Sequence, residues 1–272
     1  MVALFWFTVR QTLLQRKIWV TLLLLLGPCA LTLLIRHFKS EDDLQDVWER
    51  FHASMQFVLF LVVLPLICML FGTSLIGAEV ESRTLVYLLT RKMRRATVLV
   101  VRFAAVALVL SVLMELTLLA QYGCAVGGVD VAGLESPGGD GAWQPLDELL
   151  CYLRAGPAGV VAFLAAFVLI GLLVSRPLSI SIVYVIVVEL IISNLPVGVR
   201  VYTVSHQLRK GMFHSIPGLA SMYELSPDQV AEFFPPGSTG TWAVCGLVLA
   251  ALLVGGVLMT TRELVPAKIG RE

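Results

Sequence analysis

Residues 57–78 read FVLFLVVLPLICMLFGTSLIGA and contain no charged side chain. A helix rises about 1.5 Å per residue, so a run of this length crosses a hydrocarbon core about 30 Å thick. The 272-residue chain shares this character, because 58% of its residues are hydrophobic, only 14% are charged, and the mean hydropathy is +0.87. Soluble domains carry about 25% charged residues. The sequence therefore excludes a soluble globular protein and predicts an integral membrane protein.

Five other segments are long and apolar enough to cross a bilayer. They are 18–35, 98–120, 158–175, 178–197 and 242–261. In lipid each segment must satisfy its own backbone hydrogen bonds, which favours helices. We therefore predict an all-α integral membrane protein whose six transmembrane helices form one domain over residues 1–272.

The charges are distributed unevenly across the predicted loops. Of the 20 Lys and Arg residues, 13 fall on the side that holds both termini and the connection after 57–78, and seven fall on the other side. Cytoplasmic loops are enriched in Lys and Arg, so both termini are predicted to be cytoplasmic in a multi-pass protein of the plasma or inner membrane. The net charge of only +1 offers no basic face for nucleic acid, and we expect none as a partner.

Three segments outside the spans have helical patterns. Residues 2–17 place Phe5, Val9 and Leu13 on one face with Ile18, which predicts an amphipathic helix in the membrane interface; a simple membrane-entry flank is the alternative. Residues 40–55 predict a helical extension of 57–78 on the outer side. Residues 198–240 predict short outer helices, one starting at 226–229, that either dip into the membrane surface or form an outer cap.

Several enzymatic signatures are missing. The chain contains no G-x-x-x-x-G-K-[ST], no H-E-x-x-H and no G-x-S-x-G, so it is not expected to be an enzyme or to hydrolyse ATP by the phosphate-loop route. The four histidines have no metal-ligand spacing and are interpreted as surface residues: His37, His52, His206 and His214. No metal site is predicted.

Two of the five cysteines fall between predicted spans. Cys124 and Cys151 both lie in the second outer loop, where an oxidising compartment would allow a disulfide. The pairing stays open, because it requires neighbouring Cα atoms.

The segment 79–95, EVESRTLVYLLTRKMRR, has the pattern of a short amphipathic helix on the cytoplasmic side. Leu85, Leu88 and Leu89 form an i, i+3, i+4 patch, with acidic residues before it and basic residues after it, as the helix dipole favours. Such a leucine patch suits the groove of a cytoplasmic partner. An ordinary positive-inside loop explains the arginines but not the leucine pattern.

This segment resembles the cytoplasmic connection of ABC exporter permeases of the type 2 family, E-x-E-x-G-T-L-x-x-L-L-S-x-P-x-x-R. The matching residues are Glu79, Glu81, Thr84, Leu85, Leu88, Leu89 and Arg95. Arg102 takes the place of a Lys at the start of the third span. Arg83 stands where the family has Gly, and Lys92 or Met93 where it has Pro, so the entry and exit of the helix can differ.

The resemblance implies a transmembrane subunit that dimerises and binds a separate cytoplasmic ABC ATPase subunit through 79–95, the coupling segment. This chain would bind no cofactor, and ATP and Mg²⁺ would be held by the partner. The residues expected at the ATPase contact are Glu79, Glu81, Arg83, Thr84, Leu85, Leu88, Leu89, Arg91, Arg94 and Arg95.

Two carboxyl groups, Glu115 and Glu189, fall inside predicted spans. Each costs about 2.5–3.5 kcal/mol on insertion scales, so each is expected to face the protein interior or water. They sit at different depths, which argues against a shared proton site. Either residue lines a translocation path or gate, or it is a neutral, hydrogen-bonded acid.

Two other functions fit the residues. One is a secondary or proton-coupled transporter that uses Glu189, and the other is a membrane scaffold that recruits a cytoplasmic protein through 79–95. A neighbouring gene for an ATPase with a phosphate loop would favour the exporter. Nothing in the residues indicates the transported substrate.

Overall fold

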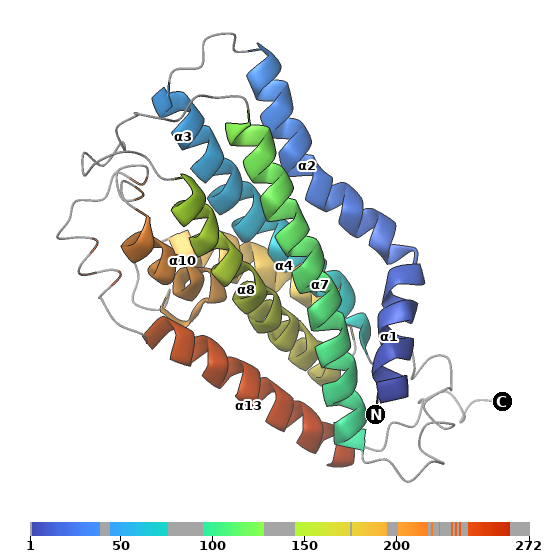
Figure 1. Ribbon diagram of the computed structural model, residues 1–272. Helices are drawn as coiled ribbons and strands as arrows, with labels where there is room; N and C mark the ends of the chain where they lie inside the picture. The colour runs from blue at the N-terminus through green and yellow to red at the C-terminus, as the bar shows by residue number, and fades with distance from the viewer. Residues whose placement is uncertain are drawn as a thin grey trace.

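The computed structural model describes residues 2–38, 44–75, 95–127, 145–174, 176–194, 201–216 and 239–261, together with the single positions 219, 223, 230, 232 and 234. The described residues form helices and contain no strand (Figure 1). In chain order the elements are α1 (Val2–Leu14), α2 (Lys17–Phe38), α3 (Leu44–Ala53), η1 (Ser54–Val63), α4 (Leu64–Gly72), α7 (Arg95–Val126), α8 (Pro145–Leu173), α9 (Pro177–Tyr184), η2 (Val185–Ile191), η3 (Ile192–Asn194), α10 (Val204–Ser215) and α13 (Thr239–Thr261).

Five helical stretches within the described residues are long and apolar enough to cross a membrane. They are Lys17–Phe38, Val47–Gly72, Ala96–Val126, Pro145–Leu173 and Pro177–Asn194. The protein is therefore a multi-pass membrane protein whose described part is helical, and the first five predicted spans overlap these helices. The sixth predicted span lies within α13, whose qualifying apolar part, Cys245–Leu258, is shorter.

The second span extends beyond its predicted boundary. α3, η1 and α4 follow one another without a break, and Val47, Trp48 and Phe51 are buried, so the described part of the extension predicted over 40–55 is helical from Leu44 onward. η1 is π-helical, so its turns are wider than those of an α-helix. These turns end at Val63, two residues before Pro65, which has no N–H to donate to the helical ladder.

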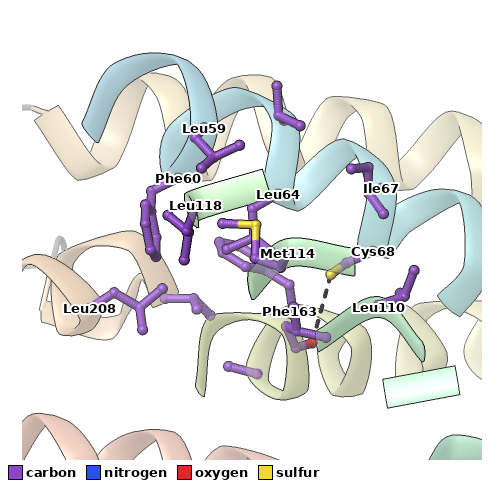
Figure 2. Close-up of a cluster of buried hydrophobic side chains, with 14 of the residues drawn as sticks. Leu59, Phe60, Leu64, Ile67, Cys68, Leu110, Met114, Leu118, Phe163 and Leu208 are labelled. Carbon is purple, nitrogen blue, oxygen red and sulfur yellow. Dashed lines mark hydrogen bonds between the residues drawn. The ribbon is translucent and has the colours of Figure 1, made fainter. Parts of the chain in front are cut away.

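α8 occupies the centre of the bundle and packs against α4, α7, α10 and α13 (Figure 1). Figure 2 shows Phe163 of α8 among Leu64 of α4, Met114 of α7 and Leu208 of α10. Two glycines permit this close packing. A Cβ atom at Gly72 would lie 2.7 Å from Phe167 Cβ, and one at Gly159 would lie 2.7 Å from Leu64 Cδ2.

The buried face of α1 differs from the predicted one. Val9 and Ile18 are buried as expected, but Leu13 is 49% exposed, and Thr8 and Thr12 face inward instead. The threonine hydroxyls donate to the carbonyl oxygens of Leu4 and Thr8, at 2.9 and 2.8 Å. Because these hydroxyls are satisfied within their own helix, they can pack against α7 at little cost.

Candidate functional site

The coupling segment lies outside the described residues. Among the residues expected at the ATPase contact, this applies to Glu79, Glu81, Arg83, Thr84, Leu85, Leu88, Leu89, Arg91 and Arg94. Arg95 is the first residue of α7, and its side chain is likewise outside the description. The described chain stops at Leu75 beyond α4 and resumes at Arg95, so the segment joins the second and third spans.

Arg102, which takes the place of the family's lysine, is buried with 6% of its surface exposed. It lines a cavity of about 40 Å³ together with Thr8, Gln11 and Thr12 of α1, with Gln15 just after α1, and with Phe71, Ser74 and Leu75 around the end of α4. Polar residues of α1 thus lie beside Arg102 where α1, α7 and the end of the second span meet.

Glu189 is fully buried, and its carboxylate receives hydrogen bonds at the start of α10. The backbone N–H groups of Val204 and Ser205 donate to Oε1 and Oε2, at 3.3 and 3.0 Å. The Tyr184 hydroxyl donates to Oε1 at 2.9 Å. A carboxylate at a helix N-terminus is stabilised by the free N–H groups and the helix dipole. Glu189 therefore ties the fifth span to α10, and this geometry favours a structural role over an open path.

Arg209, on α10, completes the polar surroundings of Glu189. Its Nη1 donates to Asn194 Oδ1 at 2.8 Å, and its guanidinium lies 5.8 Å from the centroid of the Tyr223 ring. Burial lowers the pKa of Arg209, while Tyr223 and Glu189 oppose that shift. Burial also raises the pKa of Tyr223, which the Arg209 cation opposes.

Glu115 is partly exposed on α7 and faces α8. A Cβ atom at Gly156 would lie 3.2 Å from Glu115 Oε1, so the Glu115 carboxyl group packs against this glycine of α8. Oε1 has no hydrogen-bond partner among the described residues. Because Glu115 faces α8 and Glu189 faces α10, the described contacts do not bring the two carboxylates into one site.

Cys124 and Cys151 are free thiols, so the pairing that the sequence left open is not formed. Both residues are helical rather than in a loop, since α7 extends to Val126 and α8 begins at Pro145. Each thiol also faces another partner. Cys124 lies beside Cys29 of α2, and Cys151 lies beside Ser215 of α10.

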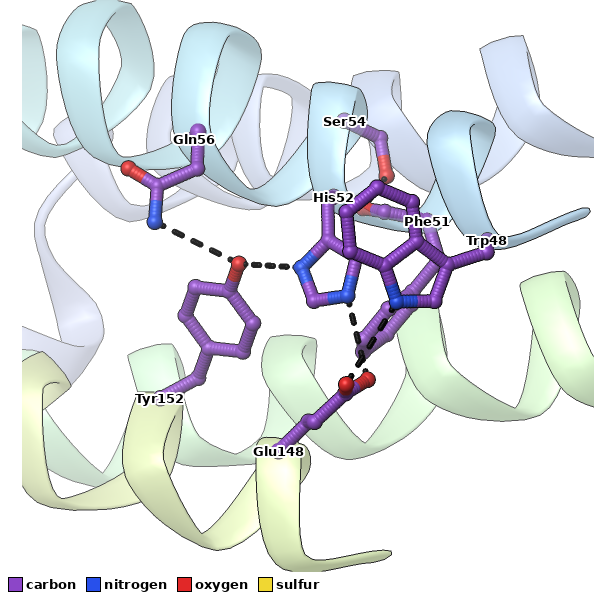
Figure 3. A network of polar contacts seen from close by, with 7 residues as sticks. All are labelled: Trp48, Phe51, His52, Ser54, Gln56, Glu148 and Tyr152. Carbon is purple, nitrogen blue, oxygen red and sulfur yellow. Dashed lines mark hydrogen bonds and ion pairs between the residues drawn. The ribbon is translucent and has the colours of Figure 1, made fainter. Parts of the chain in front are cut away.

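A buried polar network between α3 and α8 was missed in the sequence (Figure 3). His52 is 0% exposed, so its interpretation as a surface residue is wrong, and His206 is buried as well. His52 Nε2 lies 3.0 Å from Glu148 Oε2, and its Nδ1 lies 2.7 Å from the Tyr152 hydroxyl. Trp48 Nε1 donates to Glu148 Oε1 at 3.4 Å.

One arrangement of hydrogen bonds satisfies every ring and hydroxyl group in this network. Gln56 Nε2 can only donate, and it lies 3.3 Å from the Tyr152 hydroxyl oxygen. A His52 tautomer with its N–H on Nε2 donates to Glu148 and leaves Nδ1 to accept the Tyr152 O–H. Gln56 also donates to Met212 Sδ at 2.9 Å, so the network extends to α10.

Within the described ranges, no three His, Cys, Asp or Glu side chains gather where they could hold a metal ion. The buried polar groups therefore join helices: Glu189 joins the fifth span to α10, and the His52 network joins the second and fourth spans.

Comparison with known proteins identifies the family. The family model described as ABC-2 family transporter protein matches residues 14–189, which is more than half of the chain and includes the coupling segment. This match confirms the resemblance carried by residues 79–95. No curated protein matches the chain. The chain belongs to the ABC-2 family of transporter proteins, as a membrane component of a transporter.

Proposed function

We propose that this protein is the transmembrane subunit of an ATP-driven exporter, that two copies form the translocation path, and that each copy binds a separate ATPase subunit through residues 79–95. The observation that carries the proposal is the family match, which extends over the coupling segment. The absence of a phosphate loop from the sequence supports a separate source of ATP hydrolysis.

The proposed topology has six spans, with both termini in the cytoplasm and the protein in the cell membrane. The excess of Lys and Arg on the side of the termini supports this orientation. α13 supplies the sixth span in this proposal, since it packs against α7 and α8 as part of the bundle. The chain then forms one permease domain over residues 1–272.

The packing of the spans supports a mechanical link. The coupling segment follows α4 and precedes α7, and both of these helices pack against α8. Nucleotide-driven closure of the ATPase pair would displace the segment, and the two helices would transmit that displacement to α8 and the outer helices. The ATPase shifts this equilibrium only through contacts that differ between the two states. Glu115 is the candidate for a path-lining residue in this proposal, whereas the contacts of Glu189 with α10 support a structural role for that carboxyl group.

The test uses the full chain purified together with its ATPase subunit. Changing both Leu88→Asp and Leu89→Asp places charge in the proposed contact, and loss of two central anchors should weaken co-purification at least tenfold and abolish stimulated ATP hydrolysis. Val2→Asp is the matched control, because Val2 is 83% exposed and lies far along the chain from the coupling segment. Unchanged co-purification and hydrolysis in the double variant would refute the proposed contact.

A further inference from the structure

α2 and α7 enclose an apolar groove of about 390 Å³. Its walls include Trp19, Leu22 and Leu26 from α2, and Leu113, Leu116 and Ala120 from α7. This volume lies within the range of pockets that hold small molecules, about 300–1,000 Å³. The Thr117 hydroxyl in its wall donates to the carbonyl oxygen of Leu113 at 2.9 Å. The groove thus offers its occupant an almost entirely apolar surface.

α7 is held against α1 at one end of the groove and against α2 at the other. Toward the amino terminus, Val9 of α1 packs with Ala105 and Val109 of α7. At the opposite end, Gln121 Nε2 donates to Thr32 Oγ1 at 2.6 Å, and Arg36 Nη1 donates to the Gly127 carbonyl oxygen at 2.5 Å. The separation of α2 and α7 between these contacts is therefore set by the fold.

The groove has the length of one leaflet. Trp19 and Cys29 mark its extent along α2, and ten residues of helix rise about 15 Å, which is half of a hydrocarbon core of about 30 Å. Trp19 is 74% exposed at the end nearest the amino terminus, where an interfacial aromatic residue is expected. An extended hydrocarbon chain of one leaflet matches both the depth and the polarity of this groove.

A positive charge stands at the same end. Arg16 precedes Trp19 by one turn, its carbonyl oxygen accepts the Trp19 N–H at 3.3 Å, and its side chain is exposed. Lys17 turns the other way, since its Nζ donates to the Leu70 carbonyl oxygen of α4 at 3.3 Å. Arg16 thus supplies an exposed positive charge one turn before Trp19, at the end of the groove nearest the amino terminus.

We propose that the α2–α7 groove binds one acyl chain of an anionic phospholipid from the leaflet on the side of the amino terminus, with the lipid phosphate at Arg16. A second copy of the protein is a less suitable occupant of the groove, because of the positive charges near its amino-terminal end. Residues 2–38 contain no Asp or Glu, so a symmetric contact through α2 would bring Arg16 and Lys17 near their own counterparts with no acidic partner on either helix. An anionic lipid neutralises the same charge.

The first experiment maps the acyl chain. The full chain is placed in nanodiscs of phosphatidylcholine containing a phosphatidylglycerol probe with a diazirine in its acyl chain, and crosslinked peptides are quantified. Crosslinks at 19–29 and 113–120 should exceed those around Leu253 of α13 severalfold, although Leu253 is 69% exposed. Ala120→Trp fills the groove and should remove this excess, whereas Ala250→Trp, at an exposed alanine of α13, should leave it unchanged. Crosslinking that follows exposure alone, or that survives Ala120→Trp, would overturn the proposal.

The second experiment tests the phosphate contact without altering the groove. Arg16→Gln should lower the preference for phosphatidylglycerol over phosphatidylcholine about fivefold. This is the change in affinity expected from removing one basic side chain near an anionic membrane surface. Arg10→Gln removes the same charge from α1 and should have a smaller effect. Equal effects of the two variants would refute a specific contact at Arg16. A disulfide between two copies carrying Leu26→Cys, in a chain whose own cysteines are replaced by Ala, would instead assign the groove to a second copy.

Discussion

Glu148 is the acceptor on which the buried network between α3 and α8 depends. Its two carboxylate oxygens take the N–H groups of Trp48 and His52, and all three side chains are buried. Each buried donor left without an acceptor costs about 1–3 kcal/mol. Glu148→Ala should therefore lower the midpoint of thermal unfolding strongly, and Glu148→Gln, which keeps one acceptor oxygen, should lower it less.

Asp147→Ala is the control for this change, because Asp147 is the exposed neighbour of Glu148 in the first turn of α8. Its midpoint of unfolding should stay close to that of the unaltered protein. Equal losses for Asp147→Ala and Glu148→Ala would contradict the importance of the buried network.

The sequence left two roles open for Glu189, a structural role and a role in proton transfer, and variants of this residue distinguish them. As an acceptor for the Val204 and Ser205 N–H groups, it should behave as a helix cap, and its replacement by Ala should cost about 0.5–2 kcal/mol of stability. Glu189→Gln keeps one acceptor and should lose less stability while retaining transport-coupled ATP hydrolysis. A Gln variant with full stability and no coupled activity would instead point to proton transfer.

The residue-scale contacts show what the sequence could and could not predict. Trp48 and His52 are four residues apart, as are Glu148 and Tyr152, so each pair could be placed on one helix face. The contact between these two faces joins residues about 100 positions apart. Neither i, i+4 spacing specifies which other helix its face contacts. For the same reason, the capping of α10 by Glu189 could not be distinguished from a path-lining position.

At the scale of the helices, the approach of α4 to α8 depends on Gly72. A Cβ atom there would meet Phe167 Cβ at 2.7 Å and the Leu164 carbonyl oxygen at 3.3 Å, so the helices would have to separate. Overpacking of this kind costs about 1–3 kcal/mol. Gly72→Ala should accordingly lower the unfolding midpoint and weaken coupling between the ATPase and the outer helices.

Gly123→Ala is the matched control, since a Cβ atom at Gly123 on α7 meets nothing within 4 Å. Alanine favours a helix by up to about 1 kcal/mol over glycine, so this variant should be neutral or more stable. Destabilisation by both variants would show that the close packing at Gly72 is not the cause.

The helices themselves were well predicted, because long uncharged runs and helical periodicity are local properties of the chain. The first five spans were found, but their starts were placed too late: α8 begins at Pro145 rather than near residue 158. The turns of α8 before residue 158 carry Glu148 and Tyr152. Their polar side chains excluded these turns from a span predicted by hydropathy. Polar residues buried by tertiary contacts therefore account for this error, and the inward-facing Thr8 and Thr12 account for the difference between the buried face of α1 and the predicted one.

For the whole molecule, the proposed topology places α1 and the segment before α10 on opposite sides of the membrane. Val2 and Tyr202 are 83% and 85% exposed, so a cysteine at either position is open to reagents. In a chain whose own cysteines are replaced by Ala, Tyr202→Cys should react with a membrane-impermeant maleimide in intact cells. Val2→Cys should react only after permeabilisation. The reverse pattern would invert the orientation, and labelling of both from outside would exclude five spans between them.

The capping of α10 by a side chain of the fifth span also makes α10 sensitive to how that span is turned. Glu189 reaches these amides from one side of η2, so even a partial rotation of η2 about its axis would withdraw the Glu189 oxygens from the two amides. Val204 and Ser205 would then exchange their amide hydrogens with solvent. Hydrogen exchange at this single turn thus provides a direct readout of axial rotation in the membrane during the transport cycle.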